Sequence, residues 1–154
     1  MRVKPPLVAL AATSALLSGC QTVGEAPVAS FDQTLDRHIS AIQSRDMKGM
    51  IDTITTGDRL ELIFPDGSRQ ATRQEFLDFH EKWFADRSWV MVVEPVSSWQ
   101  GRDYGYALYR TSYDPDGSGP KAGRPAWLSL GFALENGHWR LVHDQNTRID
   151  AAPQ

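Results

Sequence analysis

The sequence predicts an α+β domain in which helices are followed by an antiparallel meander. Two observations predict this class. Apolar residues recur at helical spacing up to about residue 85, and from Ser88 onward the apolar period changes to two. Helices segregated from consecutive hairpins are typical of α+β domains rather than of parallel α/β sheets. The length of 154 residues fits one domain, and the single cysteine excludes a disulfide framework.

Two helices are predicted at the start of this domain. Ser30 and Gln33 form a capping-box pattern before an apolar stripe that recurs at helical spacing, which predicts a helix to about Arg45. Asp46 precedes a short second helix that extends to about Ile54. Gly49 weakens this second helix, because glycine has a low helix propensity.

A short hairpin and a third helix follow. Residues 60–64 predict a strand, and a Pro-Asp-Gly turn leads to a short partner strand that ends near Gln70. Thr72 and Glu75 repeat the capping-box pattern before a helix over residues 73–85. The apolar stripe of this helix is continuous and contains Phe76, Leu77, His80, Trp83 and Phe84.

Four longer strands form the predicted meander, over residues 89–99, 104–113, 126–135 and 138–146. The dipeptide Asn136-Gly137 is typical of a tight hairpin, because both residues tolerate positive φ. The strand over 126–135 is apolar on both faces, so both faces need cover. We therefore expect one face to pack in the core and the other to form a homodimer with a second copy of the chain.

The first 19 residues predict a signal peptide that is removed. Arg2 and Lys4 precede an apolar run over residues 7–17, which is too short to span a bilayer. The run ends in Leu17-Ser18-Gly19-Cys20, which resembles the lipobox of bacterial lipoproteins. The resemblance implies lipid attachment, palmitate included, at Cys20, and Gln21 beside it implies an outer-membrane location facing the periplasm. The alternative is a plain secretory signal with an incidental cysteine.

In this interpretation residues 20–30 form a lipidated tether and residues 31–150 form the domain. The order of elements, together with the ending Gly137-His138-Trp139-Arg140-Leu141-Val142-His143-Asp144-Gln145, resembles the SnoaL-like members of the nuclear transport factor two-like superfamily. The resemblance implies a cystatin-like α+β roll, in which a cone-shaped, curved antiparallel sheet packs on the long helix and leaves an open pocket. It also implies a dimer through the outer face of the sheet.

Acid–base residues are predicted from the last strand and the long helix. Strand alternation places Trp139, Leu141, His143 and Gln145 on one face, which we expect to face the core. His80 is expected to reach the same cavity, so His80 and His143, with Asp144 in support, are the candidate catalytic residues. The alternative is that both histidines are packed structural residues with ordinary hydrogen-bond partners.

A ligand pocket is predicted from the aromatic side chains and one arginine. Arg110 could bind a ligand carboxylate, or it could pair with Glu94 on the neighbouring strand. The aromatic residues could line a pocket for a flat or apolar ligand, or they could pack in the core. The predicted pocket residues are Trp83, Trp89, Tyr104, Tyr106, Arg110, Trp127 and Gln145.

Several classes of site are not supported by the sequence. The net charge of −3 argues against nucleic-acid binding, and the four histidines lack metal-ligand spacing, so we expect no metal and no cofactor. Asp114, Asp116, Ser118 and Gly119 match the first positions of a calcium loop. Pro125, however, stands where a bidentate glutamate belongs, which favours a long hairpin turn.

Three functions remain. The first is a lipid-anchored protein of the cell envelope whose pocket binds a small ligand or a protein partner without catalysis. The second is a small-molecule isomerase, cyclase or dehydratase that uses histidine acid–base chemistry. The third is an assembly subunit of the envelope whose apolar sheet face is its interface. The resemblance implies a superfamily that contains isomerases, cyclases, dehydratases, non-catalytic pocket proteins and assembly modules, so the fold by itself does not decide among these functions.

Overall fold

The computed structural model describes residues 28–119 and 123–150. The predicted signal peptide and the lipidation site at Cys20 lie outside the described residues. Within the described part no helix is long and apolar enough to span a membrane. The elements are, in order, α1 (Phe31–Ser44), α2 (Met47–Ile51), β1 (Arg59–Ile63), β2 (Arg69–Thr72), α3 (Arg73–Ala85), β3 (Val90–Gln100), β4 (Tyr104–Asp114), β5 (Arg124–Glu135) and β6 (His138–Arg148).

The strands form one curved sheet with the order β2-β1-β6-β5-β4-β3. The predicted meander from β3 to β6 is confirmed, and its neighbouring strands are antiparallel. The prediction of an entirely antiparallel sheet is wrong at one pair, because β1 runs parallel to β6. These two strands are distant in sequence, so no hairpin sets their relative direction. The parallel pair joins the first half of the domain to its last strand.

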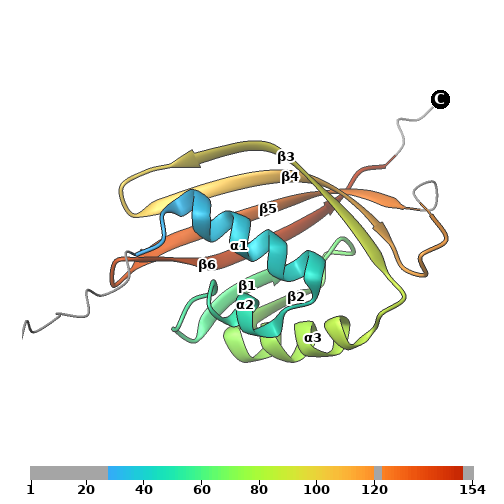
Figure 1. Ribbon diagram of the computed structural model, residues 1–154, viewed down its shortest axis with the longest axis horizontal. Coiled ribbons are helices and arrows are strands. Elements are labelled where there is room, and N and C mark those ends of the chain that lie inside the picture. Colours follow the sequence, from blue (N-terminus) through green and yellow to red (C-terminus); the bar gives the residue numbers. More distant parts are fainter. Residues whose placement is uncertain (1–27, 120–122, 151–154) are drawn as a thin grey trace, which may run out of the picture.

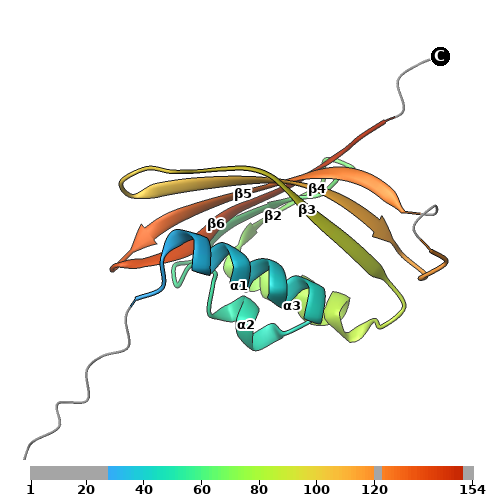
Figure 2. The same ribbon diagram turned by 45° about the horizontal axis from the view of Figure 1, so that its top comes forward.

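The helices cover only one face of the sheet. Figures 1 and 2 show α1, α2 and α3 on the same side, under the concave face, while the opposite face carries no helix from the described residues. The core lies between these layers. It includes Phe31 and Leu35 from α1, Phe76 from α3, and a row of inward side chains on β5, which are Ala126, Leu128, Leu130 and Phe132.

Both predicted capping boxes are present. Ser30 accepts a hydrogen bond from the Gln33 amide at the start of α1, and Thr72 accepts one from the Glu75 amide at the start of α3. The second helix ends earlier than predicted, at Ile51. Thr53 Oγ1 bonds to backbone carbonyls of α2, and the following residue, Ile54, pairs with β6, so the chain leaves the helix there.

A β-bulge interrupts the alternation of β6. Gly131 pairs with His143 while Phe132 pairs with Leu141, so Val142 has no partner on β5. An extra residue exchanges the two faces of every position beyond it. Leu141 therefore faces the core, but beyond the bulge Asp144 is the buried residue and His143 is only half-buried. The prediction that His143 and Gln145 face the core is wrong for this reason.

Candidate functional site

A cavity of about 490 Å³ lies between α3 and the concave face of the sheet. Its volume is within the range of pockets that bind small molecules. Residues of the β1–β2 turn, the start of β5 and the end of β6 surround its mouth. Most of the wall is apolar or aromatic, with contributions from Ile42, Leu62, Phe64, Phe79, Trp83, Met91, Tyr113 and Leu128.

His80 lies in this wall and is 2% exposed. Its Nδ1 lies 2.8 Å from the Phe76 carbonyl, which can only accept, so Nδ1 carries the ring proton and donates. Nε2 then keeps a lone pair, and it has no hydrogen-bond partner among the described residues. Burial lowers the pKa of His80 to about 4, so the ring is neutral at pH 7. A neutral imidazole with a free Nε2 can accept a hydrogen bond or a proton.

Asp144 is the other titratable group in the floor of the cavity, and it is 3% exposed. Its Oδ1 accepts a hydrogen bond of 3.0 Å from Asn146 Nδ2, which also lines the cavity. Burial raises the pKa of the Asp144 carboxyl to about 7, against the opposing effect of that hydrogen bond. Near neutral pH the carboxyl exists in both forms and can donate or accept a proton.

Stacked aromatic rings support the helical side of the cavity. Trp83 lines the cavity and stacks on Trp89, with ring centroids 4.4 Å apart and an interplanar angle of 17°. Trp89 is 1% exposed, and its Nε1 donates to the Trp83 carbonyl at 2.8 Å. The Arg45 guanidinium lies 3.9 Å from the Trp89 ring centroid, a cation–π contact. Trp89 therefore packs against Trp83 without lining the cavity, so the prediction that Trp89 is a pocket residue is wrong.

The mouth is polar. Asp66 and Ser68 lie in the β1–β2 turn, and Arg124 and Arg148 lie at the ends of β5 and β6. The Asp66 carboxylate accepts hydrogen bonds from the amide and hydroxyl of Ser68, which lower the pKa of Asp66 below its ordinary value. Within the described residues neither arginine forms a salt bridge, but the positive charge of Arg148 also contributes to the lowered pKa of Asp66, so a ligand anion would share Arg148 with that carboxylate.

Of the predicted site residues, Trp83, His80 and Asp144 lie at the cavity and the others do not. Strand alternation and register place the remaining strand residues on the outer face of the sheet, away from the helices. Arg110 lies there directly opposite Glu94 on β3. The residues that belong to this outer face are Tyr104, Tyr106, Arg110, Trp127, His143 and Gln145. Because His80 and His143 are on opposite sides of the sheet, the predicted pairing of these two histidines is wrong.

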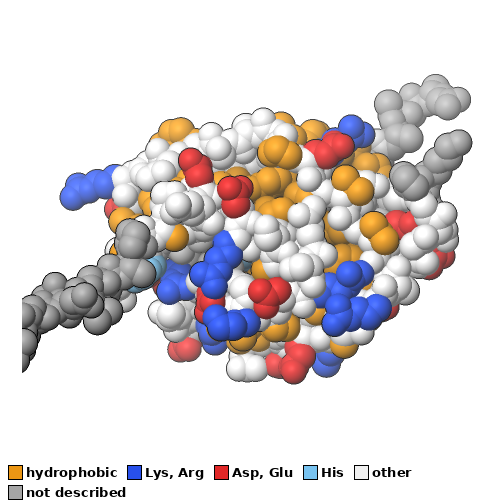
Figure 3. All heavy atoms as spheres, viewed as in Figure 1, with side chains coloured by type: hydrophobic (Ala, Val, Ile, Leu, Met, Phe, Trp, Pro, Cys, Tyr) orange, Lys and Arg blue, Asp and Glu red, His pale blue; other side chains and the backbone are white. Residues whose placement is uncertain are grey.

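The outer face remains exposed in the monomer. Trp99 is 62% exposed, and Tyr104, Trp127 and Val92 are also exposed. Gly131 contributes to this face, because a Cβ at this position would lie 2.3 Å from the Tyr104 hydroxyl oxygen. The homodimer expected through this face stays a prediction. On the face that carries the helices, basic and acidic side chains are interspersed (Figure 3), which differs from the basic stripe typical of nucleic-acid binding.

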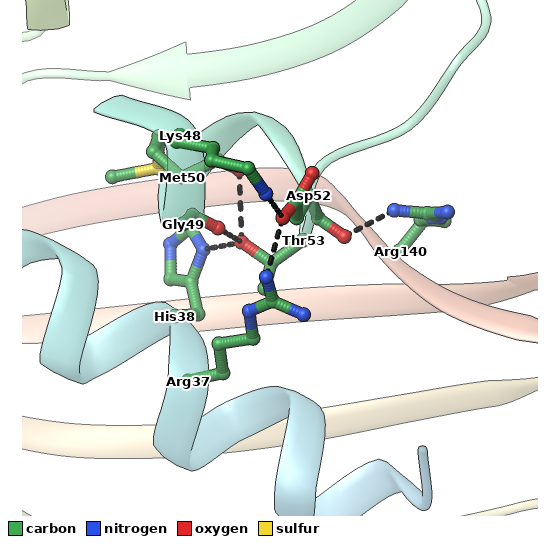
Figure 4. Close-up of polar contacts among 8 residues, drawn as sticks. All are labelled: Arg37, His38, Lys48, Gly49, Met50, Asp52, Thr53 and Arg140. Carbon is green, nitrogen blue, oxygen red and sulfur yellow. Dashed lines mark hydrogen bonds and ion pairs between the residues drawn. The ribbon is translucent and has the colours of Figure 1, made fainter. Parts of the chain in front are cut away.

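A buried hydrogen bond joins α1 to the residues that follow α2, next to the cavity. His38 of α1 is fully buried, and its Nδ1 lies 2.8 Å from Thr53 Oγ1 (Figure 4). The Thr53 hydroxyl donates to the carbonyls of Gly49 and Met50, so it accepts from His38. His38 Nε2 is buried without a partner in the described part of the chain. Beside it, the Asp52 carboxylate accepts from Lys48 and Arg37, and the Asp52 carbonyl accepts from Arg140.

The residues that the structure describes contain no evident metal centre. Among residues 28–119 and 123–150, no three His, Cys, Asp or Glu side chains are grouped so that they could hold a metal ion. Asp114, the first position of the calcium-like pattern, is buried, and its carboxylate accepts from the backbone amides of Asp116 and Gly119. These bonds are typical of a turn. The groups that the cavity itself presents include two buried titratable side chains, His80 and Asp144, further hydrogen-bonding groups and an apolar wall.

Comparison with solved structures supports the same fold. A domain from Thiobacillus denitrificans, described as a calcium/calmodulin-dependent protein kinase type II association domain, has a TM-score of 0.69 at 15% identity, covering 80% of this chain and 99% of its own. An NTF2-like protein from Streptomyces avermitilis, described as a dehydratase, has a TM-score of 0.64 at 14% identity, covering 77% and 92%. An uncharacterized protein with a cystatin-like fold from Caulobacter vibrioides has a TM-score of 0.63 at 13% identity, covering 77% and 87%.

A search of the curated proteins finds no match to this chain. A family model described as a SnoaL-like domain matches residues 32–146. This match covers the three helices and nearly the whole sheet, the cavity floor included. The matched segment is well over half of the sequence, and the solved structures share its roll, so the chain belongs to the SnoaL-like domain family.

Proposed function

We propose that this protein binds a small, largely apolar molecule in the cavity between α3 and the sheet. The observation that carries the proposal is the cavity of about 490 Å³, whose lining is mostly apolar and includes two buried polar groups, His80 and Asp144. Apolar pockets with a few placed polar groups are typical small-molecule sites. Burial of an apolar ligand supplies the affinity, and the polar groups determine its orientation.

A variant that fills the cavity tests this proposal. Ala126 faces the cavity from β5, so Ala126→Phe places a ring inside it, whereas Ala133→Phe places the same ring on the outer face of the same strand. The probe is N-phenyl-1-naphthylamine, an uncharged aromatic molecule whose fluorescence rises in apolar surroundings. We expect saturable binding to the wild type and to Ala133→Phe, and at least about tenfold weaker binding to Ala126→Phe. Equal binding to both variants would contradict the proposal.

Acid–base catalysis in the same cavity is a second candidate function. It is favoured by Asp144, whose pKa is raised to about 7 by burial, together with the neutral ring of His80 in the same wall. Carboxyl groups with pKa values near the working pH are efficient general acids and bases. Asp144 thus takes the place that the sequence assigned to His143. In this case Asp144→Asn would retain ligand binding and lose turnover.

We also propose that the protein is exported and lipid-anchored to the cell envelope through Cys20. The sequence Leu17-Ser18-Gly19-Cys20 after a short apolar run supports this proposal. The chain enters the domain where Phe31 packs against Phe132 and Trp139, beside the β5–β6 hairpin. Arg124 and Arg148, which line the cavity mouth, lie at the opposite ends of β5 and β6. Figure 1 shows these strand ends away from the start of α1.

The anchor can be tested by one substitution in the full-length chain. We expect Cys20→Ser to move the protein from the membrane fraction to the soluble fraction of cells, because the sulfur atom of Cys20 would form the thioether bond to the lipid. Thr22→Ala is the matched control and is expected to stay with the membrane. Retention of Cys20→Ser in the membrane fraction would overturn this part of the proposal.

A further inference from the structure

The polarity of the cavity changes in steps from its floor to its mouth. On β6 the inward side chains beyond the bulge are Asp144, which is buried, Asn146, which is half-buried, and Arg148, which is exposed. Asp144 and Arg148 are four positions apart on the strand, a distance of about 13 Å at ~3.3 Å per residue. The cavity therefore has a buried hydrogen-bonding end, which contains the Asp144 carboxyl, and a cationic end.

The neighbouring strand repeats this order. On β5 the inward residues are Leu130 and Leu128, both buried, then Ala126 and finally Arg124 at the mouth. The register places Leu130 beside Asp144 and Ala126 beside Arg148. Arg124 and Arg148 are consequently diagonal neighbours on one face, close enough for both to reach one charged group of a ligand. β5 thus provides an apolar surface beside the polar side chains of β6, and each strand carries a guanidinium at the mouth.

An anionic group of a ligand is favoured at the mouth and disfavoured at the floor. At the floor it would be removed from water among apolar side chains and would lie near the carboxyl of Asp144. At the mouth it would remain partly hydrated and could accept hydrogen bonds from the guanidiniums of Arg124 and Arg148. Asp66 also lies at the mouth; its carboxylate accepts two hydrogen bonds from Ser68 and is stabilised in part by the charge of Arg148, so Arg124 is the guanidinium on which an incoming anion depends most.

We propose that the cavity selects amphipathic organic anions, with the apolar body between α3 and the sheet and the anionic group between Arg124 and Arg148. This inference rests on the proposed binding function and adds the chemical class of the ligand. An apolar body about 10 Å long fits the distance from the floor to the arginines. The uncharged end of such a molecule contacts the His80 and Asp144 side chains.

Two probes with the same aromatic rings, one uncharged and one anionic, test the proposed ligand class separately from the proposed binding function. N-phenyl-1-naphthylamine is uncharged, and 8-anilinonaphthalene-1-sulfonate carries one sulfonate on the corresponding rings. We expect the wild type to bind the sulfonate more tightly, and the double variant Arg124→Gln/Arg148→Gln to bind it about tenfold more weakly, with unchanged affinity for the uncharged probe. A cooperative denaturant unfolding transition like that of the wild type shows that the variant is folded, and unchanged affinity for the uncharged probe shows that the cavity is retained.

The matched control is Arg59→Gln/Arg102→Gln, which removes two exposed arginines that do not line the cavity. We expect this control to bind both probes like the wild type, and added salt to weaken binding of the sulfonate only. If the uncharged probe binds but the double variant keeps full affinity for the sulfonate, the ligand class is wrong and the binding function stands. If the uncharged probe does not bind the wild type, the binding function fails, and the ligand class fails with it.

Discussion

Asp144→Asn is expected to raise the free energy of unfolding by about 4 kcal/mol at pH 8 and to leave it nearly unchanged at pH 4. Burial raises the pKa of the folded carboxyl to about 7, above its ordinary value of 3.8. The folded state therefore holds a proton that the unfolded chain releases, so the stabilising contribution is complete below about pH 4 and is lost as the pH rises through 7. Asparagine has no proton to lose and still accepts the hydrogen bond from Asn146.

The measurement is denaturant unfolding of both proteins between pH 4 and pH 9. Glu81→Gln serves as the control, because Glu81 is an exposed carboxylate on α3 and its removal should leave the pH dependence as in the wild type. The physical basis of the expected difference is the cost of ionising a carboxyl group away from water. If the free energy of unfolding changed with pH in the same way for Asp144→Asn and the wild type, Asp144 would not have a pKa raised by burial. The support for acid–base chemistry in this cavity would then be lost.

His38→Asn is expected to reduce the loss of stability at acid pH. Burial, with a smaller contribution from His80, lowers the pKa of His38 to about 3 from 6.5. Its contribution to stability is present above about pH 6.5 and is lost as the pH falls toward 3, at a total cost of about 5 kcal/mol. This cost is comparable with the whole stability of a typical domain, so acid unfolding of the wild type is expected between pH 3 and pH 5.

The amide introduced by His38→Asn can occupy the position of the imidazole Nδ1 and donate to Thr53, but the lost ring volume beside Phe132 should cost about 1–3 kcal/mol at pH 7. The slope of stability against pH is therefore the quantity to compare. His138→Asn, at an exposed position of the β5–β6 hairpin, is the matched control and should keep the wild-type slope. His80, with its pKa lowered to about 4, leaves a residual acid sensitivity. If the slope of stability against pH is the same in His38→Asn as in the wild type, the lowered pKa of buried His38 does not cause the acid sensitivity.

These buried groups act in opposite directions. The two histidines favour folding as the pH rises to 6.5, while Asp144 opposes folding as the pH rises through 7. The wild type should therefore be most stable slightly below neutral pH. The same groups connect stability with the site, because His80 and Asp144 line the cavity and His38 holds α1 against α2 beside it.

Local patterns in the sequence determined the elements and one wall of the site. Capping boxes at Ser30 and Thr72 and the period of apolar residues predicted α1, α3 and the meander, because each depends on neighbours in the chain. The stripe on α3 likewise placed His80 and Trp83 toward the sheet, where both line the cavity. The same helical spacing would also have identified Phe79, one turn before Trp83.

The tertiary structure alone decided which side of the sheet each residue of the last strand faces. Strict alternation assigned His143 to the core, but the bulge at Val142 exchanges the faces beyond it and brings Asp144 to the cavity instead. The bulge depends on how β5 and β6 pair and curve. The one extra residue on β6 cannot be recognised from the order of apolar and polar residues in the sequence. The parallel contact of β1 with β6 is of the same kind. Helices and hairpins follow from local sequence here, whereas the chemistry of the cavity floor depends on long-range strand pairing.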